Sequence, residues 1–253
     1  MIPDATTLLV IVILVALVGM LIGSIGVGGV ILVPALTWAT DISVHLAISA
    51  AMFSYLFSGL LGAYLYSRKG SIQWSSGIWL AVGAMPGAYL GSKFISGMPD
   101  DSVKLVIAAF VIFAGINTLI QPKHNNTQTP DLSAFWLIII GVLVGISSAM
   151  TGTGGPLLLV PLLMWLKWPV LTVVGLSQFI QLPISLLATL GNVMHGSVDF
   201  KLGAAIAAVM VIGVAIGANL AHRLPAEILR KFVGMVLGVV GGWMLWQSMG
   251  AFA

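Results

Sequence analysis

The sequence predicts an all-α integral membrane protein made of two related halves, and three features indicate this. Of the 253 residues, 59% are hydrophobic and only 7% are charged. Several uncharged stretches reach the ~20 residues that a helix needs to cross the hydrocarbon core of a bilayer. Glycines also recur at one fixed offset, so that Gly26 is matched by Gly152 and Gly29 by Gly155. Such recurrence is typical of an internal repeat.

The low charge excludes a water-soluble globular protein. A soluble domain carries about a quarter charged residues, whereas this chain has 10 basic and 7 acidic side chains. They gather in short clusters between apolar stretches, which is typical of loops at a membrane surface. No basic patch exists beyond these loops, so we expect the lipid bilayer, and no nucleic acid, as a partner. The expected location is the cell membrane, with multiple passes, and the inner membrane if the source is Gram-negative.

Nine glycines of the first half coincide with glycines of the second, where composition alone gives about two. Chance resemblance between glycine-rich membrane helices is the alternative. We divide the chain into a first repeat (1–121), a polar linker (122–131) and a second repeat (132–253). Each repeat is predicted to contain four helical segments. They cover 6–39, 44–67, 72–96 and 102–121, and then 132–167, 170–194, 200–222 and 226–249.

Basic residues mark the cytoplasmic side of a membrane protein and therefore bear on the orientation of the repeats. The pair Arg68-Lys69 follows the second segment of the first repeat, whereas the basic cluster 223–231 follows the third segment of the second repeat. This exchange favours an inverted over a parallel repeat, with each first segment entering and leaving as a glycine-broken hairpin. Both termini then lie outside the cytoplasm. A parallel repeat stays open, because Lys93, Lys104 and Lys201 lie on the opposite loops.

Two glycine-rich stretches, 23–34 and 150–161, interrupt the first segment of each repeat. Broken backbone at membrane depth must be buried in protein or line a wet cavity. A helix that starts after such a break presents unpaired N–H groups and partial positive charge, which bind anions. Close packing of helices is the alternative explanation for the glycines. The candidate binding residues here are Ser24, Gly26, Gly28, Gly29, Thr151, Gly152, Thr153, Gly154 and Gly155.

The segment 170–194 carries polar residues at three- and four-residue steps, which place them on one helix face. They are Gln178, Gln181, Ser185, Thr189 and Asn192. Amide and hydroxyl groups bind sulfonate or carboxylate oxygens without a formal charge, so Gln178 and Gln181 are also candidate substrate-binding residues. Hydrogen bonding between helices is an equally good explanation for the two glutamines. Asp41 and His45 are the candidates for proton coupling, since a histidine titrates near neutral pH.

The paired motifs Gly23-Ser-Ile-Gly-Val-Gly-Gly29 and Thr151-Gly-Thr-Gly-Gly-Pro156, with Pro34 and Pro161, resemble the sulfite exporter TauE/SafE family. The resemblance covers essentially the whole chain and implies transport of sulfite, sulfonates or related organosulfur and small organic anions. The two motifs differ from each other at one equivalent position, where the first has Val30 and the second has Pro156. The two halves of the site are therefore not expected to be equivalent.

We expect a secondary transporter that binds a small anion between two broken-helix N-termini near the midplane and works by alternating access. A membrane subunit of a larger permease complex and an anion channel are the alternatives, and a homodimer is an expected assembly. No cofactor and no metal site are indicated, because the chain has no cysteine and no metal-spaced histidine cluster. An enzyme is not expected, since no nucleophile and base are placed together.

Overall fold

The computed structural model describes residues 5–40, 42–120 and 130–225, together with five positions beyond them. Within these ranges the chain forms nine helices and no strand. The first five are α1 (Ala5–Ile25), α2 (Gly29–Thr40), α3 (Val44–Arg68), α4 (Trp74–Ser96) and α5 (Asp100–Ile120). The others are α6 (Ala134–Thr151), α7 (Pro156–Trp165), α8 (Val170–His195) and α9 (Phe200–Ala221). Asp41, most of the linker and most of the predicted segment 226–249 lie outside the described residues.

The outer surface of the helices is apolar enough to face lipid. Five helices in the described part are long and apolar enough to cross a membrane, and they cover Leu8–Ile25, Val44–Arg68, Ala134–Thr151, Val170–His195 and Phe200–Ala221. The outer face of α4 exposes Trp74, Ile78, Val82, Leu90 and Phe94. A soluble monomer rarely exposes so continuous an apolar face. The prediction of an all-α, multi-pass membrane protein is therefore confirmed.

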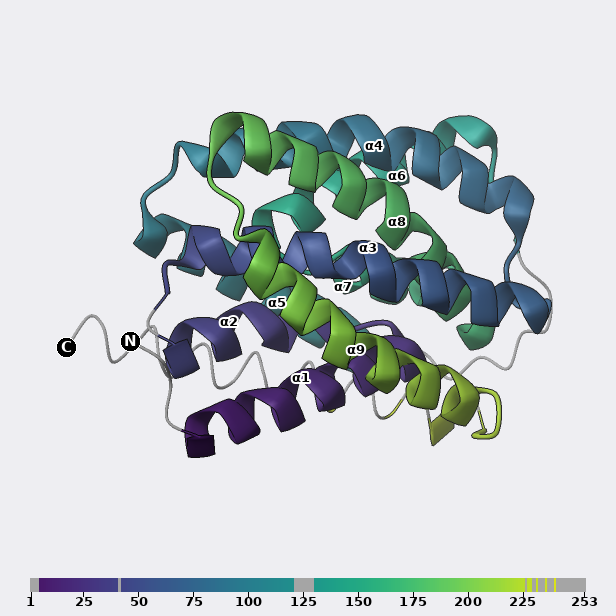
Figure 1. The fold of residues 1–253 in the computed structure, drawn as a ribbon. Helices are drawn as coiled ribbons and strands as arrows, with labels where there is room; N and C mark the ends of the chain where they lie inside the picture. Colours follow the sequence, from purple (N-terminus) through teal and green to yellow (C-terminus); the bar gives the residue numbers. More distant parts are fainter. Residues whose placement is uncertain are drawn as a thin grey trace.

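The two halves pack against each other through equivalent pairs of helices (Figure 1). The first helix of each half packs along the fourth helix of the other half, so that α1 lies on α9 and α6 lies on α4. Glycines permit these contacts, because a Cβ added to Gly83 would overlap the carbonyl of Ile138, and one at Gly213 would overlap that of Ala16. Small residues of this kind allow helix backbones to touch in membranes.

Matching helices of the two halves run in opposite directions. The central pair α3 and α8 is antiparallel, since Gly59 faces Gln181 while Gly62 faces Gln178. Helix α9 runs parallel to α3, and α4 runs parallel to α8, so the pair α4 and α9 is also opposed. The contacts that fix these directions are Gly203 with Ala50, Tyr66 with His222, Gly77 with Leu176, and Gly191 with Ser92.

The predicted interruptions of the first segment lie at residues 26–28 and 152–155 in the structure. Gly26, Gly152, Gly154 and Gly155 have φ angles of +81°, +69°, +75° and +116°. L-residues with a side chain rarely adopt this region, so glycine is needed there. Helix α7 then begins at Pro156, whose missing N–H would have no intrahelical partner at that position. Each break reverses the chain and forms a hairpin, α1 with α2 and α6 with α7 (Figure 1).

Candidate functional site

The two glycine turns, one from each half, meet in the interior of the protein. A Cβ added to Gly29 would lie 2.6 Å from the carbonyl oxygen of Thr153. A Cβ added to Gly26 would lie 3.2 Å from Cγ2 of Val160 and 3.7 Å from Cβ of Pro156. Gly26, Gly29 and Thr153 are all buried. The starts of α2 and α7 are thus in direct contact.

The start of α2 is closed by tight turns. The N–H of Val30 donates to the carbonyl of Val27 at 3.4 Å, a long hydrogen bond. The N–H of Ile31 donates to the carbonyl of Gly28 at 3.1 Å. The N–H groups of Gly28 and Gly29 come just before these bonds in the chain. In the described part of the chain, neither of them donates to a backbone carbonyl. They are the amides that a helix start leaves for another partner.

The start of α7 is built in a related way. The N–H groups of Gly152 and Thr153 both donate to the carbonyl of Ser148, at 2.9 and 3.3 Å. For the N–H groups of Gly154 and Gly155, the described residues supply no backbone acceptor. In the described part, no lysine, arginine, aspartate, glutamate or histidine is buried. The groups that can bring partial positive charge to this place are therefore the two helix starts.

Tyr55 of α3 connects the two turns. Its hydroxyl donates to the carbonyl of Gly29 at 3.3 Å, and its ring carbon Cδ2 lies 2.9 Å from the position of a Cβ added to Gly154. The side chain is completely buried. Sequence reasoning did not select Tyr55 as a candidate. The repeat offset could have found it, because Tyr55 is the counterpart of Gln181 in the second half.

The two candidate glutamines of α8 reach across the interface between the halves. Nε2 of Gln178 donates to the carbonyl of Ile22, in the last turn of α1, at 2.5 Å. Nε2 of Gln181 donates to Oγ of Ser58 on α3 at 3.4 Å, and it lies 3.1 Å from the Cβ position of Gly154. The Oε1 atoms of both glutamines are buried without a hydrogen-bond partner among the described residues. Both side chains thus lie beside the turns with unused hydrogen-bonding capacity.

The polar residues of α8 share one buried face, as their spacing indicates. We call this set the α8 stripe: Gln178, Gln181, Ser185, Thr189 and Asn192. Seven buried side-chain N or O atoms lack a partner within the described ranges, and four of them belong to the stripe. Leaving such atoms unpaired is costly, so each calls for water, an ion or a ligand. The stripe forms a polar line from the glycine turns to the end of α8.

The other candidates near the first turn point elsewhere. The hydroxyl of Ser24 donates to the carbonyl of Met20 on its own helix at 2.7 Å. A Cβ added to Gly28 would overlap the carbonyl of Val18, so Gly28 permits the close approach of α1 within its own hairpin. Neither of these contacts involves the second turn.

The candidates of the second turn divide between its two sides. The hydroxyl of Thr151 donates to the carbonyl of Ser147 at 2.7 Å and lies 2.9 Å from the hydroxyl of Thr153. Gly155 faces Ile184, with 3.0 Å between its added Cβ and Cδ1 of that isoleucine. Gly152 faces Ile48, with 3.0 Å to Cγ1. Only Thr153 and Gly154 of this group touch the meeting point with Gly29 and Tyr55.

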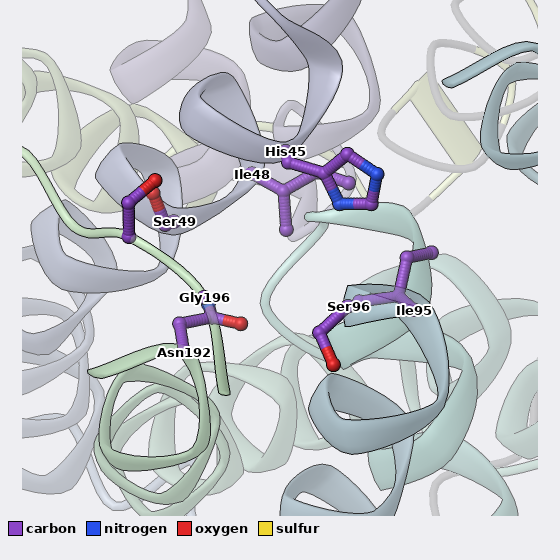
Figure 2. A pocket seen from close by; sticks show the side chains of 8 residues that line it. His45, Ile48, Ser49, Ile95, Ser96, Asn192 and Gly196 are labelled. Carbon is purple, nitrogen blue, oxygen red and sulfur yellow. The ribbon is translucent and has the colours of Figure 1, made fainter. Parts of the chain in front are cut away.

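A cavity of about 230 Å³ lies on the other side of Ile48, where α3 begins and where α4 and α8 end (Figure 2). Its lining consists of His45, Ile48, Ser49, Ile95, Ser96, Asn192, Gly196 and Ser197. Ile48 both lines the cavity and lies against Gly152, so the wall of the cavity is in contact with the second turn. Asn192, the last member of the α8 stripe, also lines it.

His45 lies at the rim of this cavity. Its Nε2 is 2.9 Å from the carbonyl of Met98 and 3.3 Å from Oδ1 of Asp100. Asp41, the other candidate for proton coupling, lies outside the described residues. The partner of His45 in the described part is therefore a carboxylate from α5, which sequence spacing does not reveal.

Comparison with known proteins matches residues 11–244 to the family described as Sulfite exporter TauE/SafE. A probable membrane transporter protein of Bacillus subtilis, YdhB, is 25% identical over 240 residues, covering 92% of this chain and 98% of the relative. Probable membrane transporter proteins of Xylella fastidiosa and Methanocaldococcus jannaschii are 26% and 25% identical, each over 92% of this chain and over 92% and 94% of their own lengths. No solved structure matches the chain.

The family match spans nearly the whole chain, and the relatives match over nearly their full lengths. The family and these relatives are transporters and not enzymes, which confirms the prediction that the protein is not an enzyme. The helices also provide the apolar spans that such a protein requires. The protein is therefore a membrane transporter and belongs to the sulfite exporter TauE/SafE family.

Proposed function

We propose that this protein is a secondary transporter of a small anion such as sulfite, a sulfonate or a related organosulfur or carboxylate anion. The observation that carries the proposal is the contact between the two turns, with the starts of α2 and α7 meeting at Gly29 and Thr153. Anions bind at helix starts because unpaired N–H groups and the helix dipole both favour negative charge. Two helix starts that meet inside the bundle therefore favour a negatively charged ligand.

The neighbouring side chains supply further donors without adding a charge. Hydrogen bonds to an ionised group are worth about 1.5–3 kcal/mol each, and a helix dipole adds up to ~2 kcal/mol in a partly buried site. The Tyr55 hydroxyl and the amides of Gln178 and Gln181 lie beside the turns. An uncharged set of donors also releases its ligand more easily than a buried arginine would, and a transporter must release as well as bind.

The site is closed in this conformation, because the turns touch. For an anion to enter between them, the halves must move apart by roughly the width of an oxyanion. We propose that the two repeats are inverted in the membrane, as the opposed directions of matching helices support. Rocking of one repeat against the other then exposes the turns alternately to each side. With Arg68 and Lys69 in the cytoplasm, the cavity at the start of α3 faces outward.

Uptake into proteoliposomes tests this function. We expect saturable uptake of labelled sulfite or methanesulfonate by vesicles that contain the protein and none by protein-free vesicles. An imposed proton gradient added in a parallel series shows whether protons are coupled. A steady conductance without saturation would instead indicate an anion channel, and activity that depends on a co-purifying ATPase would indicate a permease subunit. Absence of flux for every small anion tested would overturn the proposal.

A further inference from the structure

The cavity beside Ile48 has a counterpart at the opposite end of the antiparallel pair α3 and α8. Applying the repeat offset to three of its lining residues pairs Asn192 with Tyr66, Ser96 with His222, and Ser197 with Ser71. The two ends of this helix pair are therefore equivalent positions of the repeat, and one of them carries the cavity.

On the other side the counterpart residues contact one another and the end of α1. The hydroxyl of Tyr66 donates to the carbonyl of Gly23 at 2.8 Å, and its ring lies 4.6 Å from the ring of His222. Nε2 of His222 is 3.1 Å from Oγ of Ser71. Tyr66 is completely buried. Two aromatic rings thus occupy the region that an asparagine and a serine leave open at the cavity.

Asn192 lines this cavity, and the Nδ2 end of its side-chain amide is buried without a partner. The residue is 6% exposed, and its Nδ2 has no hydrogen-bond partner in the part of the chain that the structure describes. Its counterpart Tyr66 does have one, the carbonyl of Gly23. An unpaired amide donor at the wall of a cavity is a place where a ligand oxygen would relieve the cost of burial.

The remaining polar groups at the cavity suit an oxyanion. The hydroxyls of Ser49 and Ser96 donate to Leu46 and Lys93 carbonyls of their own helices, at 3.0 and 2.8 Å. A hydroxyl can rotate to donate to a ligand instead. Ser197 lies exposed at the mouth. Asp100, the carboxylate nearest the rim, is paired with His45 and does not line the cavity.

We propose that this cavity is an oxyanion-binding subsite, in which the Asn192 amide turns its Nδ2 toward the ligand and the hydroxyls of Ser96 and Ser197 complete the coordination. In this proposal the rings of Tyr66 and His222 close the counterpart position while the subsite is open. The subsite lies one side chain away from the second glycine turn and holds the anion before the turns part. Its ligand class, a sulfite- or sulfonate-type oxyanion, rests on the proposed function.

Equilibrium binding of labelled sulfite to the full-length protein in lipid nanodiscs tests the subsite. We expect Asn192→Ala to weaken binding about tenfold, because one hydrogen bond to a charged ligand is lost. Asn192→Asp keeps the shape but places a carboxyl group against the anion, so it should weaken binding further. Asn219→Ala is the matched control, since Asn219 is exposed and donates to Ala215 on its own helix. Its affinity should stay within twofold of the original.

Thermal unfolding of each variant, with and without sulfite, shows that the protein is folded and whether the ligand still protects it. The subsite is overturned if the original protein binds sulfite and both Asn192 variants bind within twofold of it. If the original protein binds neither sulfite nor methanesulfonate, the proposed function fails, and the subsite fails with it. The two failures are therefore distinguishable.

Discussion

Replacing Gly29 by alanine should disturb the meeting point of the two turns directly. The φ angle of Gly29 is not in the left-handed region, so alanine is allowed by the backbone and its effect is steric. The new Cβ would lie 2.6 Å from the carbonyl oxygen of Thr153 and 2.8 Å from the Tyr55 hydroxyl, where ordinary contact begins at 3.4 Å. Overpacking of this kind costs about 1–3 kcal/mol, more than the 0.5–1 kcal/mol that alanine gains over glycine in a helix.

The added methyl group would also occupy part of the space between the turns, so the turns could no longer close around a bound anion. We expect the melting temperature to fall by about 2–4 °C for each kcal/mol lost. We also expect sulfite affinity to fall about tenfold or more, as for the loss of one good hydrogen bond. Thermal unfolding and equilibrium binding on the same preparation measure the two effects.

Alanine variants of two other glycines distinguish an effect on helix packing from an effect on sulfite binding. Gly83 lies against the backbone of Ile138 in the α4–α6 contact, away from the turns, so Gly83→Ala should lower stability without changing sulfite affinity. Gly97 has no atom within 4 Å of an added Cβ, so Gly97→Ala should change neither. The reasoning is refuted if Gly29→Ala binds sulfite as the original protein does, or if Gly83→Ala loses affinity to the same extent.

Three further outcomes follow from the contacts. Gln178→Leu removes the donor to the Ile22 carbonyl, and we expect a loss of about 1 kcal/mol in stability together with slower uptake in proteoliposomes; unchanged uptake would show that Gln178 only joins helices. The chain has no cysteine, so a cysteine placed at Ser71 would be the single site of maleimide labelling. Ser71→Cys should resist an impermeant maleimide, and adding Tyr66→Ala should make the cysteine reactive from the cytoplasmic side. Equal labelling with and without Tyr66→Ala would contradict the proposal that Tyr66 and His222 close this end of the helix pair. His45→Gln should abolish any stimulation of uptake by a proton gradient, and persistent stimulation would remove His45 from the coupling.

The local features of this fold are visible in the sequence. The predicted segment 44–67 is α3 almost to the residue, and the glycine clusters mark both breaks, because hydropathy and backbone freedom are properties of neighbouring residues. The contrast between Val30 and Pro156 is also visible, and it corresponds to helices that begin differently, at Gly29 and at Pro156.

The parts that escaped prediction depend on how distant helices are rotated against each other. Tyr55 contacts both turns only because α3 passes beside them, and Ile48 contacts both the cavity and the second turn only because α6 ends beside it. Spacing along the chain cannot supply such contacts. The repeat offset can supply some of them, since it relates Tyr55 to Gln181 and Tyr66 to Asn192 before any coordinates are known.

The most direct test is an experimental structure of the protein with selenite, an oxyanion whose selenium is located by its anomalous scattering. We expect selenium density between the two helix starts, with oxygens within hydrogen-bond distance of the N–H groups of Gly28 or Gly29 and of Gly154 or Gly155. Density only in the outer cavity, or none near either turn in a protein that still transports the anion, would contradict the claim that the paired breaks bind it.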